Sequence, residues 1–278
     1  MAENSKIEWT DHTFNPWWGC TKISVGPQGA CEHCYAESLA KRVGYPHLWD
    51  GMRRTFGEKH WREPLKWDEQ AQLQRRRFRV FCASMADVFD NDAPPGERER
   101  LWGLIQRTPH LDWLLLTKRI GNAGRMLPPE WLEKPRTNVW FGATLATRAE
   151  MLRDAPKLRA LPAAIIFWSV EPMLGDFGEI PRELLPDWVI AGGESGALAR
   201  PPHPDWLRSL RDQCATVGVA FHFKQWGEWV PMLGHTEGVP VSRKHTHADG
   251  TIMGRAGKKA AGRLLEGRVW DQFPQRAT

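Results

Sequence analysis

Short apolar segments recur along the chain, and each of them is followed by polar residues. The segments have the length and the β-branched and aromatic content of buried strands. They are FRVFCAS (78–84), LDWLLLTKR (111–119), NVWFGATL (138–145), AIIFWSVEP (164–172), DWVIAGGES (187–195) and VAFHFKQW (219–226). A further strand is expected within IEWTDHTFNPWWGC (7–20), which brings the total to about seven.

Segments with helical character lie between these strands. The pattern predicts helices over 97–108, 147–161 and 205–218, with Thr147 as an N-cap and with Pro204 and Gly218 as start and stop signals. Strands that alternate with helices at this spacing indicate βαβ units and a parallel sheet with right-handed crossovers. We therefore predict an α/β fold, a complete or partial (β/α) TIM-like barrel, in preference to a doubly wound sheet.

The barrel is expected to span residues 1–230. Residues 231–278 are richer in Gly, His and Lys, and we expect them to form an irregular C-terminal extension packed on the barrel. The N-terminal residues are polar, with no apolar signal-peptide core, and the chain has no run of about 18 apolar residues. These features indicate a cytoplasmic protein.

Polar residues cluster where the expected strands end. Active-site residues of parallel α/β folds lie at the carboxyl ends of the strands, so this set is the candidate site. Its members are Ser84, Asp87, Thr117, Lys118, Arg119, Thr144, Ser169, Glu171, Glu194, Ser195, Lys224 and Gln225. We expect Arg200, Glu171 and Lys224 to converge on Glu194. A buried ion pair of these carboxylates with Lys118 or Lys224 is the structural alternative.

Three of the five cysteines lie within fifteen residues. Cys82 and Cys214 stand alone in apolar segments and are expected to be small buried side chains. Cys20, Cys31 and Cys34 suit a metal centre better than a disulfide framework. Three thiolates leave one coordination position open, which fits either a four-iron cluster with one exposed iron or a zinc site completed by His12 or His33. The position at the end of the first expected strand favours a catalytic centre.

The motifs around these cysteines resemble a known family. The segment "NPWWGC … CEHCYAE" is similar to the N-terminal signature of radical S-adenosylmethionine (SAM) enzymes of the spore-photoproduct-lyase-like group. A closer resemblance is to a phage-associated, radical-SAM-like family with a three-cysteine motif. The shared motifs run from residue 14 to 263 and are FNPWWGC, CYAE, SVEPML, GGESG, FKQWGEW and GKKAAGR.

The resemblance implies two cofactors. Cys20, Cys31 and Cys34 would ligate a four-iron, four-sulfur cluster whose open iron chelates the methionine part of SAM. One electron would cleave SAM to a 5′-deoxyadenosyl radical that abstracts hydrogen from the substrate, and an external electron donor would be needed. Ten residues separate the first two cysteines here, where the superfamily usually has three. GGESG lies near the sixth strand, so the superfamily role of its glutamate is not transferred by position.

Site roles follow from this resemblance and from the strand ends. The catalytic candidates are Glu171, Glu194 and Lys224. The candidates for binding SAM are Ser84, Asp87, Lys118, Thr144, Ser169, Glu171, Glu194, Ser195 and Gln225. Glu171 and Glu194 suit an ammonium group or ribose hydroxyls, and the cations of "TKR" (117–119) and "FKQW" (223–226) suit a carboxylate or phosphate.

The substrate class is inferred from charge and composition. The net charge is +5, the isoelectric point is about 9.0, and the chain has 16 tryptophans. With the family resemblance, these properties favour a nucleic-acid base or nucleotide as substrate, and a protein partner encoded nearby is an additional expectation. The alternatives are a zinc-containing, non-catalytic nucleic-acid-binding protein and a degenerate barrel that keeps the cluster but has lost SAM cleavage. We expect "RRRFR" (75–79) to be a solvated lead-in to a strand and "KHTHADG" (244–250) to be a polar turn.

Overall fold

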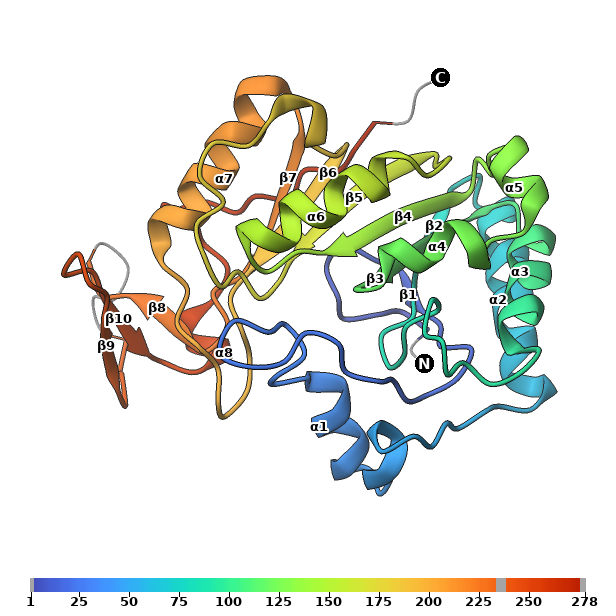
Figure 1. Ribbon diagram of the computed structural model, residues 1–278, viewed down its shortest axis with the longest axis horizontal. Coiled ribbons are helices and arrows are strands. Elements are labelled where there is room, and N and C mark those ends of the chain that lie inside the picture. Colours follow the sequence, from blue (N-terminus) through green and yellow to red (C-terminus); the bar gives the residue numbers. More distant parts are fainter. Residues whose placement is uncertain (1–2, 234–238, 276–278) are drawn as a thin grey trace. The chain divides into compact units, whose positions relative to one another are not determined.

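The computed structural model describes residues 3–233 and 239–275 (Figure 1). Seven strands follow chain order in one sheet, β1-β2-β3-β4-β5-β6-β7. Their bounds are β1 (His12–Thr13), β2 (Phe78–Cys82), β3 (Leu111–Thr117), β4 (Val139–Thr144), β5 (Ile165–Val170), β6 (Trp188–Gly192) and β7 (Ala220–Gln225). The strands are parallel and helices connect them, so the prediction of an α/β, partial TIM-like fold is confirmed.

The three helices expected from the sequence are present within one or two residues. The helical elements are α1 (Tyr35–Arg42), η1 (Pro46–Trp49), α2 (Glu58–Leu73), α3 (Glu97–Arg107), α4 (Ile120–Met126), α5 (Pro129–Glu133), α6 (Arg148–Arg159), η2 (Arg182–Leu184), α7 (Pro204–Val217) and α8 (Lys258–Ala261). Thr147 caps α6, since its hydroxyl accepts the Glu150 N–H at 3.3 Å. Gly218 ends α7 with φ of 76°, a left-handed conformation that glycine adopts without strain.

The chain divides into two compact units. The first contains Met1–Ile23, Ala36–Ala143 and Lys157–Ile166, and the second contains Ser24–Tyr35, Thr144–Pro156 and Phe167–Thr278. The first therefore carries Cys20, and the second carries Cys31 and Cys34.

The first unit is built on β1 to β4. Phe81 of β2 pairs with Leu114 of β3, and Leu115 pairs with Phe141 of β4. Parallel strands that are covered on both faces read as continuous apolar runs, which is the pattern seen here. Helices α2 and α3 lie side by side in this unit (Figure 1). Most of the tryptophans are buried, so they serve mainly as core residues.

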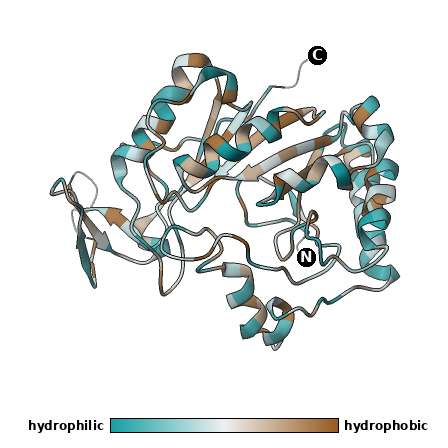
Figure 2. Cartoon of the chain, viewed as in Figure 1, coloured by the Kyte–Doolittle hydropathy of each residue, from teal (hydrophilic) through white to brown (hydrophobic). Residues whose placement is uncertain are grey.

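The second unit is built on β5 to β7, with α7 packed on β6 and β7. Leu207, Leu210 and Cys214 are buried at spacings of three and four residues along α7. The hydropathy colouring shows the resulting alternation of apolar and hydrophilic positions on this helix (Figure 2). Cys82 in the first unit and Cys214 in the second are both fully buried, as expected from the sequence.

The C-terminal part of the second unit has a small antiparallel sheet in the order β8-β10-β9, formed by β8 (Trp229–Pro231), β9 (Lys244–Thr246) and β10 (Ile252–Arg255). The sequence predicted only irregular structure there, because strands of three or four residues are too short to give a periodic pattern. Residues 234–238 and 276–278 of the expected extension lie outside the described residues. No helix in the described part of the chain is long and apolar enough to cross a membrane.

Candidate active site

Asp87 organises the carboxyl ends of β2 and β3 in the first unit. Its side chain is buried and accepts hydrogen bonds from Thr117 Oγ1 at 2.7 Å, from the Lys118 backbone N–H at 3.1 Å and from Arg119 Nη1 at 3.2 Å. The strand-end rule placed these four residues together, and the structure shows that three successive residues converge on one carboxylate. The pair between Asp87 and Arg119 is almost completely desolvated, which strengthens the attraction between the charges.

Cys20 lies against this ion pair. The Nη1 atom of Arg119 is 3.5 Å from Cys20 Sγ. Burial, and to a smaller extent the charge of Asp87, raise the pKa of the Cys20 thiol to about 12, and the Arg119 guanidinium partly opposes that rise. A metal ligand must be a thiolate, so Cys20 requires a cationic centre to ionise at neutral pH.

The local backbone requires a glycine at position 19, directly before Cys20. Its φ is 111°, and a Cβ built there would be 2.6 Å from the Leu48 carbonyl oxygen and 2.7 Å from that of Met52. The Gly19 N–H donates to the Met85 carbonyl at 3.0 Å, which ties the approach to Cys20 to the segment after β2. Only glycine fits both the backbone conformation and the available space.

A second acidic residue, Asp90, completes the surroundings of Cys20. It accepts the Thr21 N–H at 3.0 Å and pairs with Arg53 Nη2 at 2.9 Å. Arg119 lies 3.6 Å from the other carboxylate oxygen of Asp90 and also donates to the Thr21 carbonyl. Arg53 and Asp90 were not among the residues predicted from the sequence. The strand-end rule reaches Asp90 when extended along the segment after β2, whereas Arg53 carries no sequence signal.

Asn15 links the end of β1 to the segment that follows β2. Its Oδ1 accepts the Met85 N–H at 2.6 Å, and its Nδ2 donates to Ser84 Oγ at 3.1 Å. Ser84 is therefore placed beside the "NPWWGC" motif, in the same unit as Asp87 and Lys118. Asn15 is buried, and the two hydrogen bonds satisfy the amide.

In the second unit, the loop that carries Cys31 and Cys34 is tied to the segment after β4. The Cys31 N–H donates to the Ser24 carbonyl at 2.7 Å, and Ser24 Oγ donates to Glu150 Oε1 at 2.8 Å. The other oxygen of Glu150 accepts the Ala146 N–H at 2.7 Å. These contacts tie the cysteine loop to Glu150 of α6 within the second unit.

Glu194 and Arg200 form a bidentate pair at the carboxyl end of β6. The Nε–Oε2 and Nη2–Oε1 distances are 2.8 and 2.5 Å. Of the three residues expected to converge on Glu194, namely Arg200, Glu171 and Lys224, the structure pairs Arg200 with it. Two N–H groups of Arg200 also reach backbone carbonyls of the cysteine loop.

Glu171 and Lys224 instead pair with each other. Lys224 Nζ lies 2.8 Å from Glu171 Oε2, and Gln225 Nε2 donates to Glu171 Oε1 at 2.9 Å and to Ser195 Oγ at 3.0 Å. The polar ends of β5, β6 and β7 are thus joined in one hydrogen-bonded group. Thr144 and Ser169 are buried in the same unit, and the Ser169 carbonyl accepts the Leu145 N–H at 3.1 Å.

His12, one candidate for a fourth zinc ligand, is a buried residue of β1. Its ring stacks on Trp67 at 4.4 Å, and its Nδ1 accepts the Asn4 N–H at 3.3 Å. Burial lowers the pKa of His12, so the imidazole is neutral at pH 7. The other candidate, His33, lies between Cys31 and Cys34 in the second unit.

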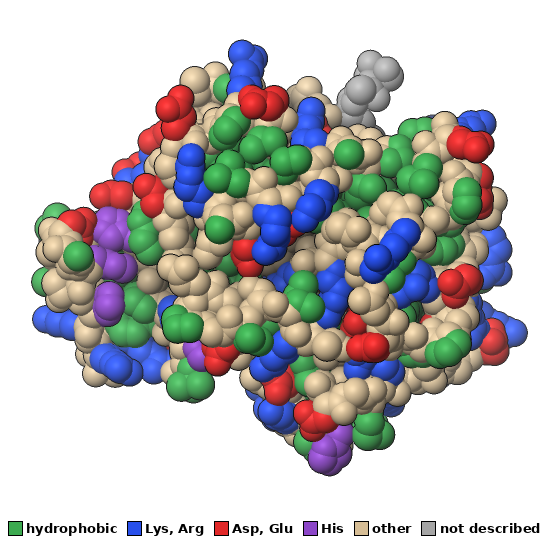
Figure 3. Space-filling view, viewed as in Figure 1, with side chains coloured by type: hydrophobic (Ala, Val, Ile, Leu, Met, Phe, Trp, Pro, Cys, Tyr) green, Lys and Arg blue, Asp and Glu red, His purple; other side chains and the backbone are tan. Residues whose placement is uncertain are grey.

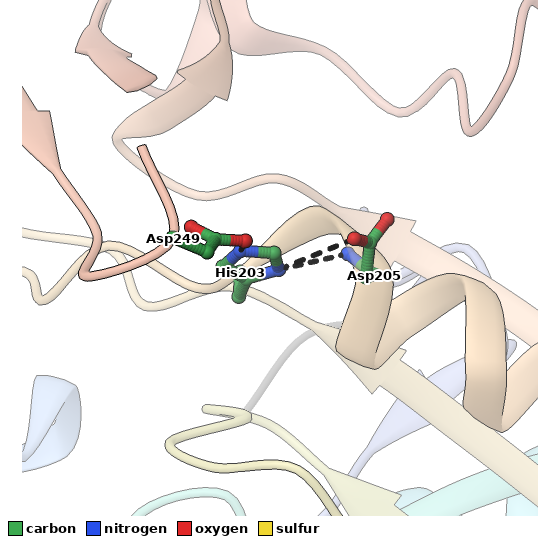
Figure 4. Close-up of side chains that lie close together, drawn as sticks. All are labelled: His203, Asp205 and Asp249. Carbon is green, nitrogen blue, oxygen red and sulfur yellow. Dashed lines mark hydrogen bonds and ion pairs between the residues drawn. The ribbon is translucent and has the colours of Figure 1, made fainter. Parts of the chain in front are cut away.

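A histidine and two aspartates meet in the second unit, between α7 and the turn before β10 (Figure 4). His203 Nε2 lies 3.0 Å from Asp249 Oδ2, while Nδ1 accepts the Asp205 N–H at 3.2 Å as the N-cap of α7. Both ring nitrogens are therefore engaged, which favours a structural contact over a metal ligand. Asp249 also accepts from Thr251, as expected for a polar turn in KHTHADG. Histidines gather at this end of the surface (Figure 3).

The basic run RRRFR is partly neutralised within the first unit. Arg76 pairs with Asp11 at 2.6 Å, Arg77 pairs with Asp112 at 2.8 Å, and Arg79 lies 3.5 Å from Asp11. Three of its four arginines thus have carboxylate partners inside the protein. The run is consequently a weak candidate for contact with nucleic acid.

Three solved structures of spore photoproduct lyase are similar to this chain in fold. A mutant form has a TM-score of 0.43 and 11% sequence identity, covering 93% of this chain and 72% of that chain. A mutant with bound AdoMet and dinucleoside spore photoproduct has a TM-score of 0.42 and 12% identity, covering 89% and 68%. The lyase complexed with dinucleoside spore photoproduct has a TM-score of 0.42 and 10% identity, covering 87% and 67%. The likeness concerns the fold alone.

No curated protein sequence matches the chain. The family model described as "Protein of unknown function (DUF5131)" matches residues 4–274, which is nearly the whole sequence. The chain belongs to this family.

Proposed function

We propose that the protein is a radical SAM enzyme that acts on a nucleic-acid base or nucleotide. Cys20, Cys31 and Cys34 are the proposed ligands of a four-iron, four-sulfur cluster that leaves one iron open to the methionine part of SAM. When bound, the cluster and SAM supply the one-electron chemistry that removes a hydrogen atom from the substrate. The protein binds and orients these groups and excludes water.

The observation that carries this proposal is the placement of the cysteines within each unit. Cys20 contacts Arg119 at the end of β3, where Asp87 also converges. The loop with Cys31 and Cys34 is tied to Glu150 after β4 and to Arg200 after β6. These contacts support the proposal, because Arg119 and Arg200 follow parallel strands and α/β enzymes carry their active sites at the carboxyl ends of such strands.

The cysteines also have suitable chemistry for a cluster. All five cysteines lie in the described part of the chain, and none is in a disulfide. Cys31 is buried, and Cys20 and Cys34 are half-buried. The N–H of Arg119 directed at Cys20 would stabilise a thiolate ligand, because hydrogen bonds to cluster sulfurs favour the reduced, more negative state.

Other strand-end residues are proposed to bind SAM and substrate. In the first unit these are Ser84, Asp87 and Lys118. Lys118 is half-buried at the end of β3, and its ammonium is proposed to bind a carboxylate or phosphate. In the second unit we propose Thr144, Ser169, Ser195 and Gln225, with Glu171 and Lys224 as the ion pair closest to the chemistry.

The proposal is tested by SAM turnover. Protein purified without oxygen is reduced with dithionite in the presence of SAM, and 5′-deoxyadenosine is measured. We expect formation of 5′-deoxyadenosine by the wild type and none by Cys31→Ala. Colourless protein with one tightly bound zinc, released by His12→Ala or His33→Ala, would instead support the zinc-containing nucleic-acid-binding protein.

A further inference from the structure

The guanidinium of Arg200 bridges two parts of the second unit. On one side it forms the bidentate pair with Glu194, at 2.8 and 2.5 Å. On the other side its Nη1 donates to the Pro27 carbonyl at 2.8 Å and its Nη2 donates to the Gly29 carbonyl at 3.1 Å. All three nitrogens of the guanidinium therefore donate hydrogen bonds, and the planar fork fixes their directions.

Glu194 is fully occupied by this contact. Its side chain is only 6% exposed, and both carboxylate oxygens accept from Arg200. Oε2 accepts a second hydrogen bond, from the Arg200 backbone N–H at 2.8 Å. If Glu194 turned toward another cation, Arg200 would lose its carboxylate partner. Leaving a charged group unpaired in a desolvated site costs free energy.

The carbonyls that Arg200 holds belong to the loop that leads directly into Cys31. Gly29 is two residues before Cys31, and the intervening Ala30 N–H donates to Ser24 Oγ at 3.1 Å. Ser24 is anchored in turn by Glu150. The loop is thus fixed at two points, by Ser24 through Glu150 and by Pro27 and Gly29 through Arg200.

We infer that Arg200, oriented by Glu194, is a positioning residue that fixes the cysteine loop at the carboxyl end of β6. The "GGESG" glutamate thereby serves the cysteine loop and does not bind SAM. This inference rests on the proposed function only where it treats Cys31 and Cys34 as cluster ligands. The restraint of the loop by Arg200 does not depend on a bound cluster and applies to the metal-free protein as well.

The restraint is measured by the alkylation rate of each cysteine in metal-free protein, resolved by mass spectrometry. The variants are Arg200→Ala, Arg200→Lys and Glu194→Gln. Arg208→Ala is the matched control, because Arg208 lies on α7 and pairs with Asp205 and Glu266. Buried Cys214 is the internal standard for an intact fold.

We expect alkylation of Cys31 to accelerate about tenfold or more in Arg200→Ala, as follows from losing charge-assisted hydrogen bonds. Arg200→Lys should behave like Arg200→Ala, because an ammonium cannot hold the carboxylate and two carbonyls in one plane. Glu194→Gln should give a smaller acceleration, and it remains informative if Arg200→Ala also exposes Cys214. An unchanged Cys31 rate in Arg200→Ala and Glu194→Gln overturns the inference.

A second measurement separates this inference from the proposed function. Iron is reconstituted into each variant, and its loss to a chelator is followed by absorbance. Faster iron loss in the Arg200 variants than in Arg208→Ala supports the positioning role. If the wild type takes up no iron, the proposed function fails while the alkylation result still decides the role of Arg200. If all variants keep iron equally and alkylate equally, the inference fails and the proposed function stands.

Discussion

The Arg119 guanidinium donates to the sulfur of Cys20, with 3.5 Å between Nη1 and Sγ. The same guanidinium pairs with Asp87 and approaches Asp90, which also pairs with Arg53, so two cations balance two buried carboxylates and one of them faces the proposed cluster ligand. Arg119 follows β3, its carboxylate partners follow β2, and it also donates to the carbonyl of Thr21, the residue after Cys20. This relationship connects the cysteine motif to the sheet within a single unit.

Removing that cation should destabilise the first unit. Arg119→Met leaves Asp87 without its cation while Asp90 keeps Arg53, and the cost of an uncompensated buried charge is about 3–5 kcal/mol. Urea unfolding of the metal-free protein gives the free energy of unfolding. Arg119→Lys should lose less because it keeps the charge. Equal stability of wild type and Arg119→Met would contradict the role given to this ion pair.

The glycine before Cys20 should resist substitution. In Gly19→Ala the new Cβ meets two backbone carbonyls and the residue keeps a left-handed φ, so we expect a loss of at least about 1 kcal/mol in unfolding free energy. Gly26→Ala is the control, since Gly26 has φ of 92° but no atom lies within 4 Å of the place that an added Cβ would take. A larger loss in Gly26→Ala than in Gly19→Ala would refute the steric explanation.

The pair between Glu171 and Lys224 should matter for turnover more than for folding. Glu171→Gln keeps the shape of the side chain but removes the charge that holds Lys224, at a half-buried site. We expect 5′-deoxyadenosine formation to fall about tenfold or more, which corresponds to losing one charge-assisted hydrogen bond. The matched control is Glu183→Gln, at an exposed glutamate of η2 in the same unit. Wild-type rates in Glu171→Gln would remove this pair from the proposed site.

Stability should fall as the pH falls from about 7.5 toward 5.5, across the ordinary histidine pKa. Burial lowers the pKa of His12 and of His60 in the folded protein, so the unfolded chain binds more protons in this range and is favoured there. His12→Phe preserves a ring against Trp67 and removes one titrating group. Urea midpoints measured across this range should depend less steeply on pH in the variant. An unchanged slope would show that His12 contributes nothing to it.

The sequence predicted the sheet well because each parallel strand is a short apolar run with a polar end. β3 illustrates this, since its apolar residues stop at Thr117 and the next two residues reach Asp87. The C-terminal sheet was missed because β8, β9 and β10 are too short for a pattern. The rule that active-site residues follow parallel strands identified candidate residues but not their partners, because pairing depends on side-chain geometry.

Glu194 shows this limit most clearly. The sequence offered Arg200, Glu171 and Lys224 as its neighbours, and the structure gives it Arg200 while Lys224 pairs with Glu171. The contacts of Arg200 with Pro27 and Gly29 join residues more than 170 positions apart, for which a single sequence holds no signal. Arg53 is a similar case, since its contact with Asp90 requires the fold.

The central proposal is that Cys20, Cys31 and Cys34 together hold an iron–sulfur cluster with one open iron. The most direct measurement combines iron and sulfide content with electron paramagnetic resonance of reduced protein, with and without SAM. We predict about four irons and four sulfides per chain, and a signal that changes when SAM is added, in the wild type and in Cys214→Ala. Replacement of any one of the three cysteines by alanine should abolish the signal. Stoichiometric zinc without sulfide, or a signal that persists in Cys20→Ala, would contradict the account.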